Sequence, residues 1–219
     1  MEFVAVDVET ANQNTSSICQ IGVATFSMGR LVNLWETLVN PEDSFAPFNS
    51  HLHGIRASDV LDSPTWFEIQ AELERHLDQS TLASHTYFDR GAMNGANARY
   101  RLKPVHVETW IDTCHLARLA WPHLHNHKLP SLARTFGITY KAHNAAEDAR
   151  CAGEILILAA RTAGLTLDDL KNTGMSRVYD QPTAHPSEDQ LAQESYFISG
   201  DQETRKRERH SYSAGIPGA

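Results

Sequence analysis

The sequence predicts a mixed α/β fold in which one five-stranded sheet carries helices on both faces. Three strand-like segments come first along the chain, and helical and strand-like segments alternate after them without internal repeats. A β-meander followed by such an alternation is typical of a mixed sheet with helices packed on its faces. At 219 residues the chain is long enough for one such domain and an extension.

The first three strands are recognised by the loop residues between them. Asn12 to Ser17 is a polar loop, and Met28-Gly29 has the composition of a turn. The apolar, β-branched segments around these breaks are therefore expected to be strands, at residues 2–8, 18–27 and 31–39.

A helix, a strand and a second helix are expected next. An apolar stripe preceded by Pro64 predicts a helix over 65–78, and its members are Trp66, Ile69, Leu73 and Leu77. The stretch TLASHT (81–86) has the composition of a fourth strand. Residues 89–101 have helical spacing, and the inward side chains are Ala92, Met93, Ala96 and Tyr100.

One more strand and three helices complete the fold. The stretch VHVETWIDT (105–113) predicts the fifth strand, and short helices are expected near 113–120 and 130–136. Gly137 fits the left-handed cap that ends the second of these helices. A long helix is expected over residues 145–161.

The composition of the chain changes after Gly164. The following residues are polar, are interrupted by Pro and Gly, and contain few periodic apolar side chains. The sequence therefore predicts a domain over residues 1–164 and a largely flexible polar extension over 165–219, which could begin with a short helix.

Composition also narrows the functional classes. No apolar stretch approaches the length of a membrane span, and the N-terminus lacks a signal pattern. Three unclustered cysteines favour a reducing compartment, so we expect a cytoplasmic protein with no membrane partner. The net charge of -8 provides no broad basic surface for nucleic acid, but part of it could form a site at which bound cations cancel the charge.

Two acidic residues interrupt the first strand. Asp7 and Glu9 follow an apolar run and share one face, because side chains alternate along a strand. Two strand residues span roughly 6.5–7 Å, so the two charges are neighbours. Taken alone, the pair could equally be acids at a frayed strand end.

Two further acids lie in the first turns of helices. Asp89 extends the apolar stripe of the helix over 89–101, and Asp148 lies on the stripe of the last helix. Acids are common in first turns because they complement the helix dipole, and either residue alone would fit that role. Four inward-facing carboxylates at the ends of elements are instead expected to form one cluster.

Divalent cations would relieve the repulsion in such a cluster. Mg²⁺ takes carboxylate oxygens, water and substrate phosphate as ligands. Two ions about 3.5–4 Å apart can activate an attacking water and stabilise the leaving oxygen of a phosphodiester. Zinc is disfavoured, because the sequence contains neither Cys pairs nor an HExxH helix.

The stretch HNAAEDA (143–149) supplies a candidate base. Asn144 is expected to cap the last helix, with Glu147 as its reciprocal partner. His143 then lies on the loop before this helix, where it can accept the proton of an attacking water. Most other histidines are expected to be surface or structural side chains, including His123, His125 and His127.

Three motifs occur in order along the chain: Asp7-Val8-Glu9-Thr10, then His85-Thr86-Tyr87-Phe88-Asp89, then His143 with four residues before Asp148. Together they resemble the motifs of the DEDDh-type 3'–5' exonucleases, a family that includes the proofreading epsilon subunit of bacterial DNA polymerase III and ribonuclease T. The segments LHGI (52–55) and IDTCHLAR…LPSLARTFGI also look like family segments. The resemblance covers roughly residues 2–162.

The resemblance implies a ribonuclease H-like fold and hydrolysis of nucleic acid from its 3' end, with release of nucleoside 5'-monophosphates. It assigns His143 as the general base and implies that Thr10 and His53 contact the terminal nucleotide. The implied ligands of two Mg²⁺ or Mn²⁺ ions are Asp7, Glu9, Asp89 and Asp148. Two positions depart from the family: Thr86 stands where Asn is common, and Phe48 where proofreading subunits have an acid.

Several alternatives stay open at this point. DNA is favoured over RNA as the strand whose single-stranded or frayed 3' end is bound, but no residue can be assigned to reading the 2'-OH. The domain could also be a catalytically idle binding module or an accessory protein that carries its nuclease to a partner. Residues 193–197 (QESYF) faintly resemble a sliding-clamp-binding peptide, so the tail could contact a clamp or polymerase. The basic run over 205–210 is expected to be solvated, and the oligomeric state is not indicated.

Overall fold

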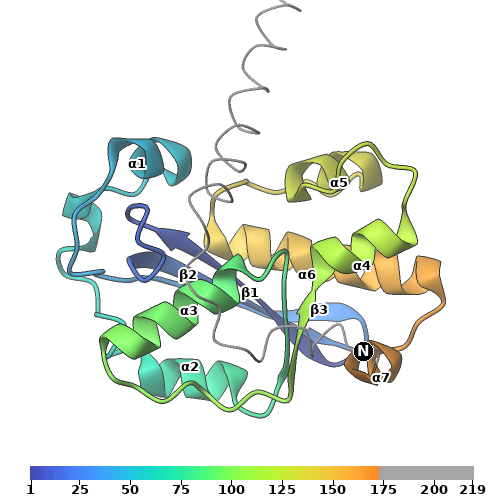
Figure 1. Ribbon diagram of the computed structural model, residues 1–219, viewed down its shortest axis with the longest axis horizontal. Helices are drawn as coiled ribbons and strands as arrows, with labels where there is room; N and C mark the ends of the chain where they lie inside the picture. The colour runs from blue at the N-terminus through green and yellow to red at the C-terminus, as the bar shows by residue number, and fades with distance from the viewer. Residues whose placement is uncertain (173–219) are drawn as a thin grey trace, which may run out of the picture. The chain divides into compact units, whose positions relative to one another are not determined.

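Five strands form one mixed sheet in the computed structural model, which describes residues 1–172 (Figure 1). The strands are β1 (Phe3–Thr10), β2 (Ile18–Ser27), β3 (Arg30–Leu38), β4 (Thr81–Ser84) and β5 (Thr109–Asp112). Their order across the sheet is β3-β2-β1-β4-β5. Strand β2 is antiparallel to both β1 and β3, whereas β4 and β5 run parallel to β1.

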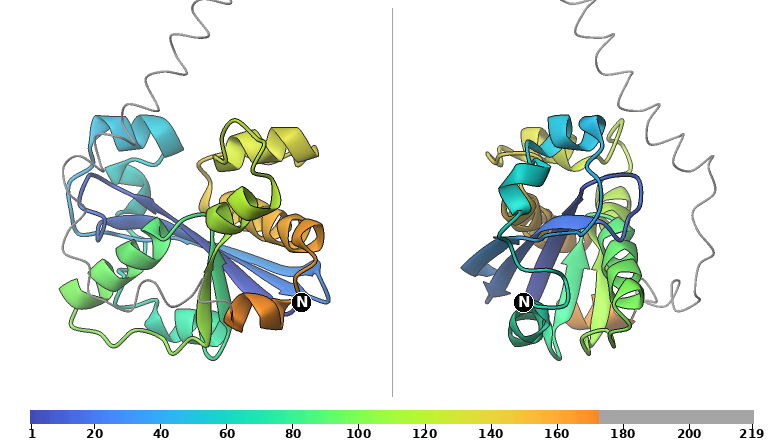
Figure 2. Two further views of the ribbon diagram at one scale, coloured as in Figure 1. Left: turned by 45° about the vertical axis from the view of Figure 1, so that its right-hand side comes forward. Right: turned by 90° about the vertical axis from the view of Figure 1, so that its left-hand side faces the viewer.

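Helices cover both faces of this sheet (Figure 2). Their bounds are α1 (Pro47–His53), the 3₁₀ helix η1 (Ala57–Val60), α2 (Gln70–Leu77), α3 (Phe88–Arg99), α4 (Thr113–Ala120), α5 (Leu129–Phe136), α6 (Ala145–Ala163) and α7 (Leu167–Asn172). Helices α4, α5 and α6 pack on one face, and α2 and α3 pack on the other. The predicted five-stranded mixed sheet with helices on both faces is confirmed.

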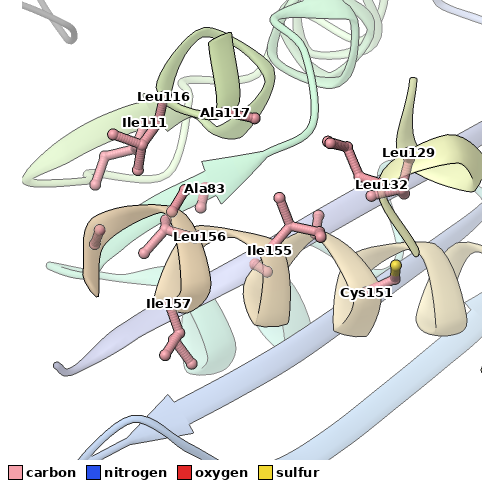
Figure 3. Close-up of a cluster of buried hydrophobic side chains, with 14 of the residues drawn as sticks. Ala83, Ile111, Leu116, Ala117, Leu129, Leu132, Cys151, Ile155, Leu156 and Ile157 are labelled. Atoms are coloured by element: carbon pink, nitrogen blue, oxygen red, sulfur yellow. The ribbon is translucent and has the colours of Figure 1, made fainter. Parts of the chain in front are cut away.

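The alternation of side chains along β1 divides the apolar core between these two faces. Phe3 and Ala5 pack with the helices on the α6 side, where Ile155 and Leu156 are fully buried (Figure 3). Every second residue of β1 from position 4 packs against α2 and α3 on the opposite face; these residues are Val4, Val6 and Val8. The same alternation directs Asp7 and Glu9 towards the α6 side.

A third, much smaller apolar cluster lies beside η1 and the residues that follow α1. It consists of Ala11, Cys19, Ile55 and Val60, all of them buried. The sequence analysis does not predict α1 or η1, because residues 40–64 show no sustained apolar periodicity. Both short helices depend on contacts with distant parts of the chain rather than on a pattern of their own.

Two predicted boundaries are displaced in the structure. Helix α2 begins at Gln70 rather than at residue 65, because Thr65 donates its backbone N–H to the Glu68 carboxylate over 2.7 Å and residues 66–69 form a turn. Strand β5 begins at Thr109 rather than at 105, because β4 offers only four residues for pairing. The other predicted elements lie within a few residues of their expected positions.

Two glycines allow α6 to approach the sheet closely. A Cβ atom at Gly22 would lie 2.1 Å from the backbone carbon of Ala145, and one at Gly153 would lie 2.2 Å from the Phe26 ring. Gly22 pairs with Asp7 across β2 and β1, so it lies directly beside the acidic residues. The missing side chain therefore lets the first turn of α6 rest on the sheet at the position of Asp7.

The Gly22→Ala variant should lose roughly 3 kcal/mol or more of unfolding free energy, the upper end of overpacking penalties, because the obstructing atoms belong to the backbone. Gly91→Ala is the matched control: Gly91 lies in α3 with open space around it, and alanine should stabilise that helix by about 0.5–1 kcal/mol. Urea denaturation of both variants measures the difference. Equal stability of the two would contradict the close approach.

The described residues extend past the predicted domain boundary at Gly164. Gly164 caps α6 with a φ of 67°, and α7 follows it and buries Leu170 in the large cluster on the α6 side. Helix α7 agrees with the short helix allowed at the start of the extension. Residues 173–219 lie outside the described part of the chain, and with them the predicted clamp-like stretch 193–197 and the basic run 205–210. Within residues 1–172, no helix combines the length and apolar character needed to cross a bilayer.

Candidate active site

Three of the predicted acidic residues converge in the structure. Asp7 and Glu9 on β1 and Asp148 in the first turn of α6 each offer a carboxylate oxygen, and these oxygens all lie within 4.8 Å of one another. Asp148 is buried, and the other two are partly buried. These three residues form the acidic cluster discussed below.

Asp89 lies next to the acidic cluster. It is buried in the first turn of α3, and its Oδ1 accepts a hydrogen bond of 3.0 Å from the backbone N–H of Val8. Val8 lies between the two acids of β1, so this bond holds the start of α3 against the strand. All four predicted carboxylates therefore lie at this end of β1.

Burial and mutual repulsion make these carboxylates poor acids. Desolvation raises the pKa of Asp7 well above its usual range, and the neighbouring charges raise it further. Desolvation and the charge of Asp148 raise the pKa of Glu9 to about 8. Burial raises the pKa of Asp89 to about 7 and that of Asp148 to about 6, although hydrogen bonds from backbone N–H groups oppose both increases. The cluster thus holds protons near neutral pH unless positive charge is supplied.

These pKa values predict that the cation-free protein loses stability as pH rises. An acid with a raised pKa binds its proton in the folded chain over a pH range in which the unfolded chain has released it, so unfolding becomes easier with increasing pH. The histidines with lowered pKa values oppose this trend as long as the unfolded rings still bind protons, which extends to about one pH unit above 6.5. Thermal unfolding in EDTA should therefore show a falling melting temperature from about pH 7.5 to about pH 9, by about 2–4 °C for each kcal/mol lost. A flat or rising melting temperature over this range would contradict the assigned pKa directions.

His143 lies directly before α6 in a strained backbone conformation. Its φ is 62°, in the left-handed region, and its partly buried ring has a pKa lowered by desolvation. The backbone N–H groups of His143 and Asn144 interact with the Asp148 carboxylate and lower its pKa. Backbone contacts therefore connect the candidate base to the acidic cluster.

The predicted cap of α6 is partly confirmed. The side chain of Asn144 accepts a hydrogen bond of 3.1 Å from the backbone N–H of Glu147, as expected for an N-cap. The prediction of Glu147 as the reciprocal partner is wrong. The backbone N–H of Asn144 donates instead to Asp148 Oδ2, at 3.1 Å. The Glu147 carboxylate is bound by Arg150 instead, with an N–O distance of 2.9 Å.

Two further residues near the cluster were not identified from the sequence. Gln20 Oε1 accepts from the backbone N–H of Ala145 at 3.1 Å, and Glu36 Oε2 accepts from Asn144 Nδ2 at 2.9 Å. These contacts join β2 and β3 to the start of α6. The sequence contains no pattern that links these distant positions, so only the fold reveals them.

The predicted nucleotide-contacting residues lie beside the end of β1. His53 Nδ1 accepts from the Ile55 N–H at 3.0 Å, so the proton of the neutral ring is on Nε2, which donates to the Thr10 carbonyl at 3.2 Å. Burial lowers the pKa of His53 and so favours this neutral form. Asn49 Nδ2 donates to the same carbonyl at 2.9 Å. Thr10 and His53 are thus adjacent, with both ring nitrogens of His53 bound to the protein itself.

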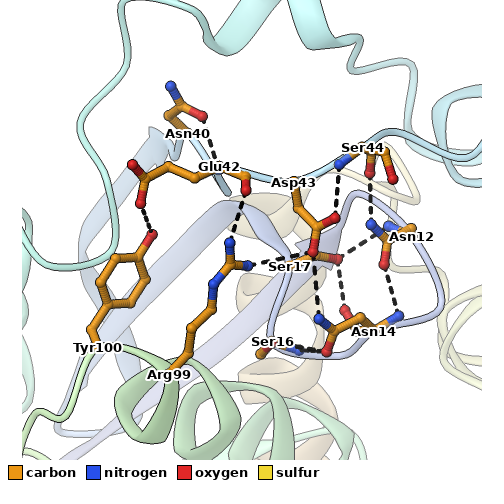
Figure 4. A network of polar contacts seen from close by, with 10 residues as sticks. All are labelled: Asn12, Asn14, Ser16, Ser17, Asn40, Glu42, Asp43, Ser44, Arg99 and Tyr100. Atoms are coloured by element: carbon orange, nitrogen blue, oxygen red, sulfur yellow. Dashed lines mark hydrogen bonds and ion pairs between the residues drawn. The ribbon is translucent and has the colours of Figure 1, made fainter.

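A polar network fixes the loops that follow β1 and β3 (Figure 4). Asn12 Nδ2 donates to the Ser44 carbonyl, and Asn14 Nδ2 donates to the Asp43 carboxylate. Arg99 at the end of α3 donates to the Glu42 carbonyl at 2.8 Å and also pairs with Asp43. The network connects the chain leaving Thr10 to the segment that leads into α1.

His85, in the second predicted motif, is bound to the protein through both ring nitrogens. Nε2 donates to the His127 carbonyl at 2.8 Å, and Nδ1 accepts from the Thr113 hydroxyl at 3.0 Å. Burial lowers the pKa of His85 to about 4, so the ring is neutral. It therefore ties the end of β4 to α4 and to the loop before α5. The His127 ring contacts the Trp121 carbonyl through Nε2 at 3.0 Å, which agrees with a structural role for that side chain.

The sequence of this domain is similar to those of known exonucleases and DNA polymerase III proteins. A sequence model of the RNase T exonuclease family matches residues 4–156. The chain is 28% identical over 159 residues to the DNA polymerase III subunit epsilon of Treponema pallidum, covering 70% of this chain and 74% of that protein. It is 31% identical over 160 residues to the PolC-type DNA polymerase III of Caldanaerobacter subterraneus, covering 71% of this chain but only 11% of the polymerase.

Solved structures share the fold at lower sequence identity. Exonuclease X in complex with 5' overhanging duplex DNA superposes with a TM-score of 0.61 at 23% identity, covering 77% of this chain and 97% of that one. A 3'-exonuclease that recognises a histone mRNA stem-loop superposes with a TM-score of 0.63 at 15% identity, covering 77% of this chain and 65% of that one. Both likenesses agree with the ribonuclease H-like fold implied by the three motifs.

Proposed function

Because the chain belongs to the RNase T family of 3'–5' exonucleases, we propose that its acidic cluster is the catalytic centre of a metal-dependent 3'–5' exonuclease. The observation that supports this most directly is the convergence of Asp7, Glu9 and Asp148 oxygens within 4.8 Å. The proposed reaction hydrolyses the last phosphodiester bond of a strand and releases a nucleoside 5'-monophosphate. A catalytically idle module is less well supported, because every carboxylate of the predicted set lies at this end of β1.

The acidic cluster fits divalent cations by the chemistry of its donors. The family depends on divalent metal ions, and hard carboxylate oxygens are the ligands that Mg²⁺ and Mn²⁺ take in proteins. The proposed ligands of two ions are Asp7, Glu9, Asp89 and Asp148. The raised pKa values support this role, since a bound cation would offset the repulsion that keeps these groups protonated. When bound, the cations would stabilise the developing charge on the attacking and leaving oxygens.

His143 is proposed as the general base. Its lowered pKa leaves the ring neutral at physiological pH, so a ring nitrogen can accept the proton of the attacking water. Its position at the start of α6 fixes it relative to Asp148 through the backbone contacts described above. The left-handed φ of His143 supports a functional role, because strained residues are retained where the surrounding structure over-determines them.

Thr10 and His53 are proposed to line the site for the terminal nucleotide. Both lie at the end of β1, next to Glu9, and α1 is held there by Asn49 and His53. Because both ring nitrogens of His53 are bound to the backbone, we propose that it acts through the face of its ring and by fixing Thr10. The strand itself is proposed to be DNA, since the polymerase III proteins are relatives of this chain. RNA is the second candidate, because a structural neighbour recognises a histone mRNA stem-loop.

The proposed cellular role and location rest on one relative and on the cysteines. The relationship to a polymerase III epsilon subunit supports a role in proofreading or DNA repair, with a polymerase as partner. Cys19, Cys114 and Cys151 are all free and buried, as expected in the reducing cytoplasm. The predicted clamp contact falls on residues outside the described part of the chain and stays a prediction.

Degradation of end-labelled strands tests the proposal. Purified protein is incubated with single-stranded DNA and RNA labelled at the 5' or the 3' end, with Mg²⁺, Mn²⁺ or EDTA. A 3' label should be released at once as a mononucleotide, a 5' label should appear in a ladder of shortening products, and EDTA should stop both. Cutting of circular single strands, or degradation from the 5' end, would refute the proposed polarity.

A further inference from the structure

Three side chains join helix α6 to the sheet, and none of them is among the predicted site residues. Gln20 Oε1 accepts from the Ala145 N–H at 3.1 Å, while Gln20 Nε2 donates to Glu36 Oε2 at 3.3 Å. The same Glu36 oxygen accepts from Asn144 Nδ2 at 2.9 Å. We call Gln20, Glu36 and Asn144 the α6 bracket.

The orientation of the Gln20 amide in this bracket is determined at both ends. A backbone N–H requires an acceptor, so Oε1 faces Ala145, and a carboxylate requires a donor, so Nε2 faces Glu36. Gln20 is buried, with 7% of its surface exposed, and its bond to Ala145 is buried too, so water does not readily replace this partner; Glu36 is exposed. Glutamate lacks the donor and methionine lacks both groups, so only an amide at position 20 completes the bracket beside Glu36.

The bracket acts on the part of α6 that carries the proposed chemistry. Ala145 is the first residue of α6 and Asn144 is its cap; His143 precedes them and Asp148 follows within one turn. At the other end, Gln20 pairs with Glu9 across β2 and β1. The bracket therefore joins β2 and β3 to the helix that carries Asp148, and β2 in turn pairs with the strand that carries Asp7 and Glu9.

We propose that Gln20 and Glu36 are positioning residues for hydrolysis, which hold His143 and Asp148 in register with β1. This inference rests on the proposed exonuclease function. Neither residue touches substrate in the proposal; each acts through the start of α6. A displacement of about 1 Å can lower a rate roughly 10²-fold, so Gln20→Met should lower kcat by about that factor while KM changes less than threefold.

An exchange of the two side chains tests the geometry. In the double variant Gln20→Glu/Glu36→Gln, the new carboxylate can accept from Ala145, and Nε2 of the new amide can donate to that carboxylate from the position of Glu36 Oε2. Because this one oxygen accepts from both Gln20 and Asn144 in the wild type, the exchange restores the bond to Ala145 and the bond between residues 20 and 36, but not the bond from Asn144. Gln20→Glu alone places two carboxylates in contact. We expect Gln20→Glu to lose kcat as Gln20→Met does, and the double variant to recover at least tenfold over Gln20→Glu at saturating Mn²⁺ and 25 °C.

Hydrogen exchange at the Ala145 amide gives a readout that is independent of activity. This amide should be protected in the wild type and in the double variant, and exchange at least tenfold faster in Gln20→Met. Gln70→Met is the matched control, because Gln70 is partly buried, donates to the Trp66 carbonyl at 3.0 Å and lies in α2 on the opposite face of the sheet. Its kcat should equal that of the wild type.

The outcomes separate this inference from the function on which it rests. A wild-type protein without nuclease activity would overturn the proposed function and the positioning role together. An active wild type whose Gln20→Met variant keeps kcat within threefold, with only a lower melting temperature, would overturn the positioning role alone. Failure of the double variant to recover kcat while Ala145 regains protection would do the same, because the restored bonds would then not control the rate.

Discussion

The Asp7→Asn variant is expected to keep its fold and to lose nuclease activity by roughly 10³-fold or more, because a catalytic metal stabilises the transition state by several kcal/mol. Asparagine has nearly the same shape as aspartate but is a much weaker ligand for a hard cation. In EDTA, the variant should melt at a higher temperature than the wild type, because asparagine, unlike Asp7, need neither bury a charge nor take up a proton when the chain folds. Release of a 3'-terminal label and thermal unfolding measure the two effects.

Asp62→Asn is the matched control for this variant. Asp62 is exposed on the loop after η1, so the same chemical change there should alter neither activity nor melting temperature. Undiminished cleavage by the purified Asp7→Asn protein would show that the acidic cluster is not the catalytic centre. A melting temperature in EDTA that falls instead of rising would show that Asp7 is favourably paired rather than repelled.

The His143→Ala variant is expected to lose turnover by roughly 10²–10⁴-fold, the usual contribution of a positioned general base. Binding of Mn²⁺ should survive, because His143 is not among the proposed ligands. In the wild type, activity should rise with pH and then level off, because the base must be unprotonated. Since burial lowers the pKa of His143, the midpoint of this rise should lie below 6.5.

Turnover measured against pH for both proteins separates catalysis from support of the loop. A purely structural His143 would leave the variant less stable, with its residual activity following the wild-type pH profile. His125→Ala serves as the control. His125 is exposed in the loop before α5, so this variant should have the same turnover, pH profile and stability as the wild type. Activity of His143→Ala within a few-fold of wild type across the pH range would end the assignment as base.

The strands and the acidic positions could be predicted because each depends on a local pattern. In the β-branched run of β1 and in the apolar stripes of α2, α3 and α6, the spacing of apolar residues along the sequence shows which side chains are buried. Asp7 and Glu9 were visible because they interrupt such a run, and Asp148 because it lies on such a stripe. Their placement together at one end of β1 follows from the order of the elements.

What could not be predicted depends on contacts between distant segments. Helix α1 has no apolar stripe and is held by Asn49 and His53 against the Thr10 carbonyl. The role of Gln20 requires that β2 lie beneath the start of α6, 125 residues along the chain from it. Asp148 replaced Glu147 as the reciprocal partner of the cap because Arg150 competes for Glu147, which no capping pattern includes.

The four-residue apolar cluster beside η1 also indicates that the segment containing it opens more readily than the elements on the two faces of the sheet. The free energy of a local opening grows with the apolar surface that it exposes, and this cluster is far smaller than the clusters on the two faces of the sheet. Peptide groups over residues 47–60 should therefore exchange with deuterium sooner than those of β1 and α6.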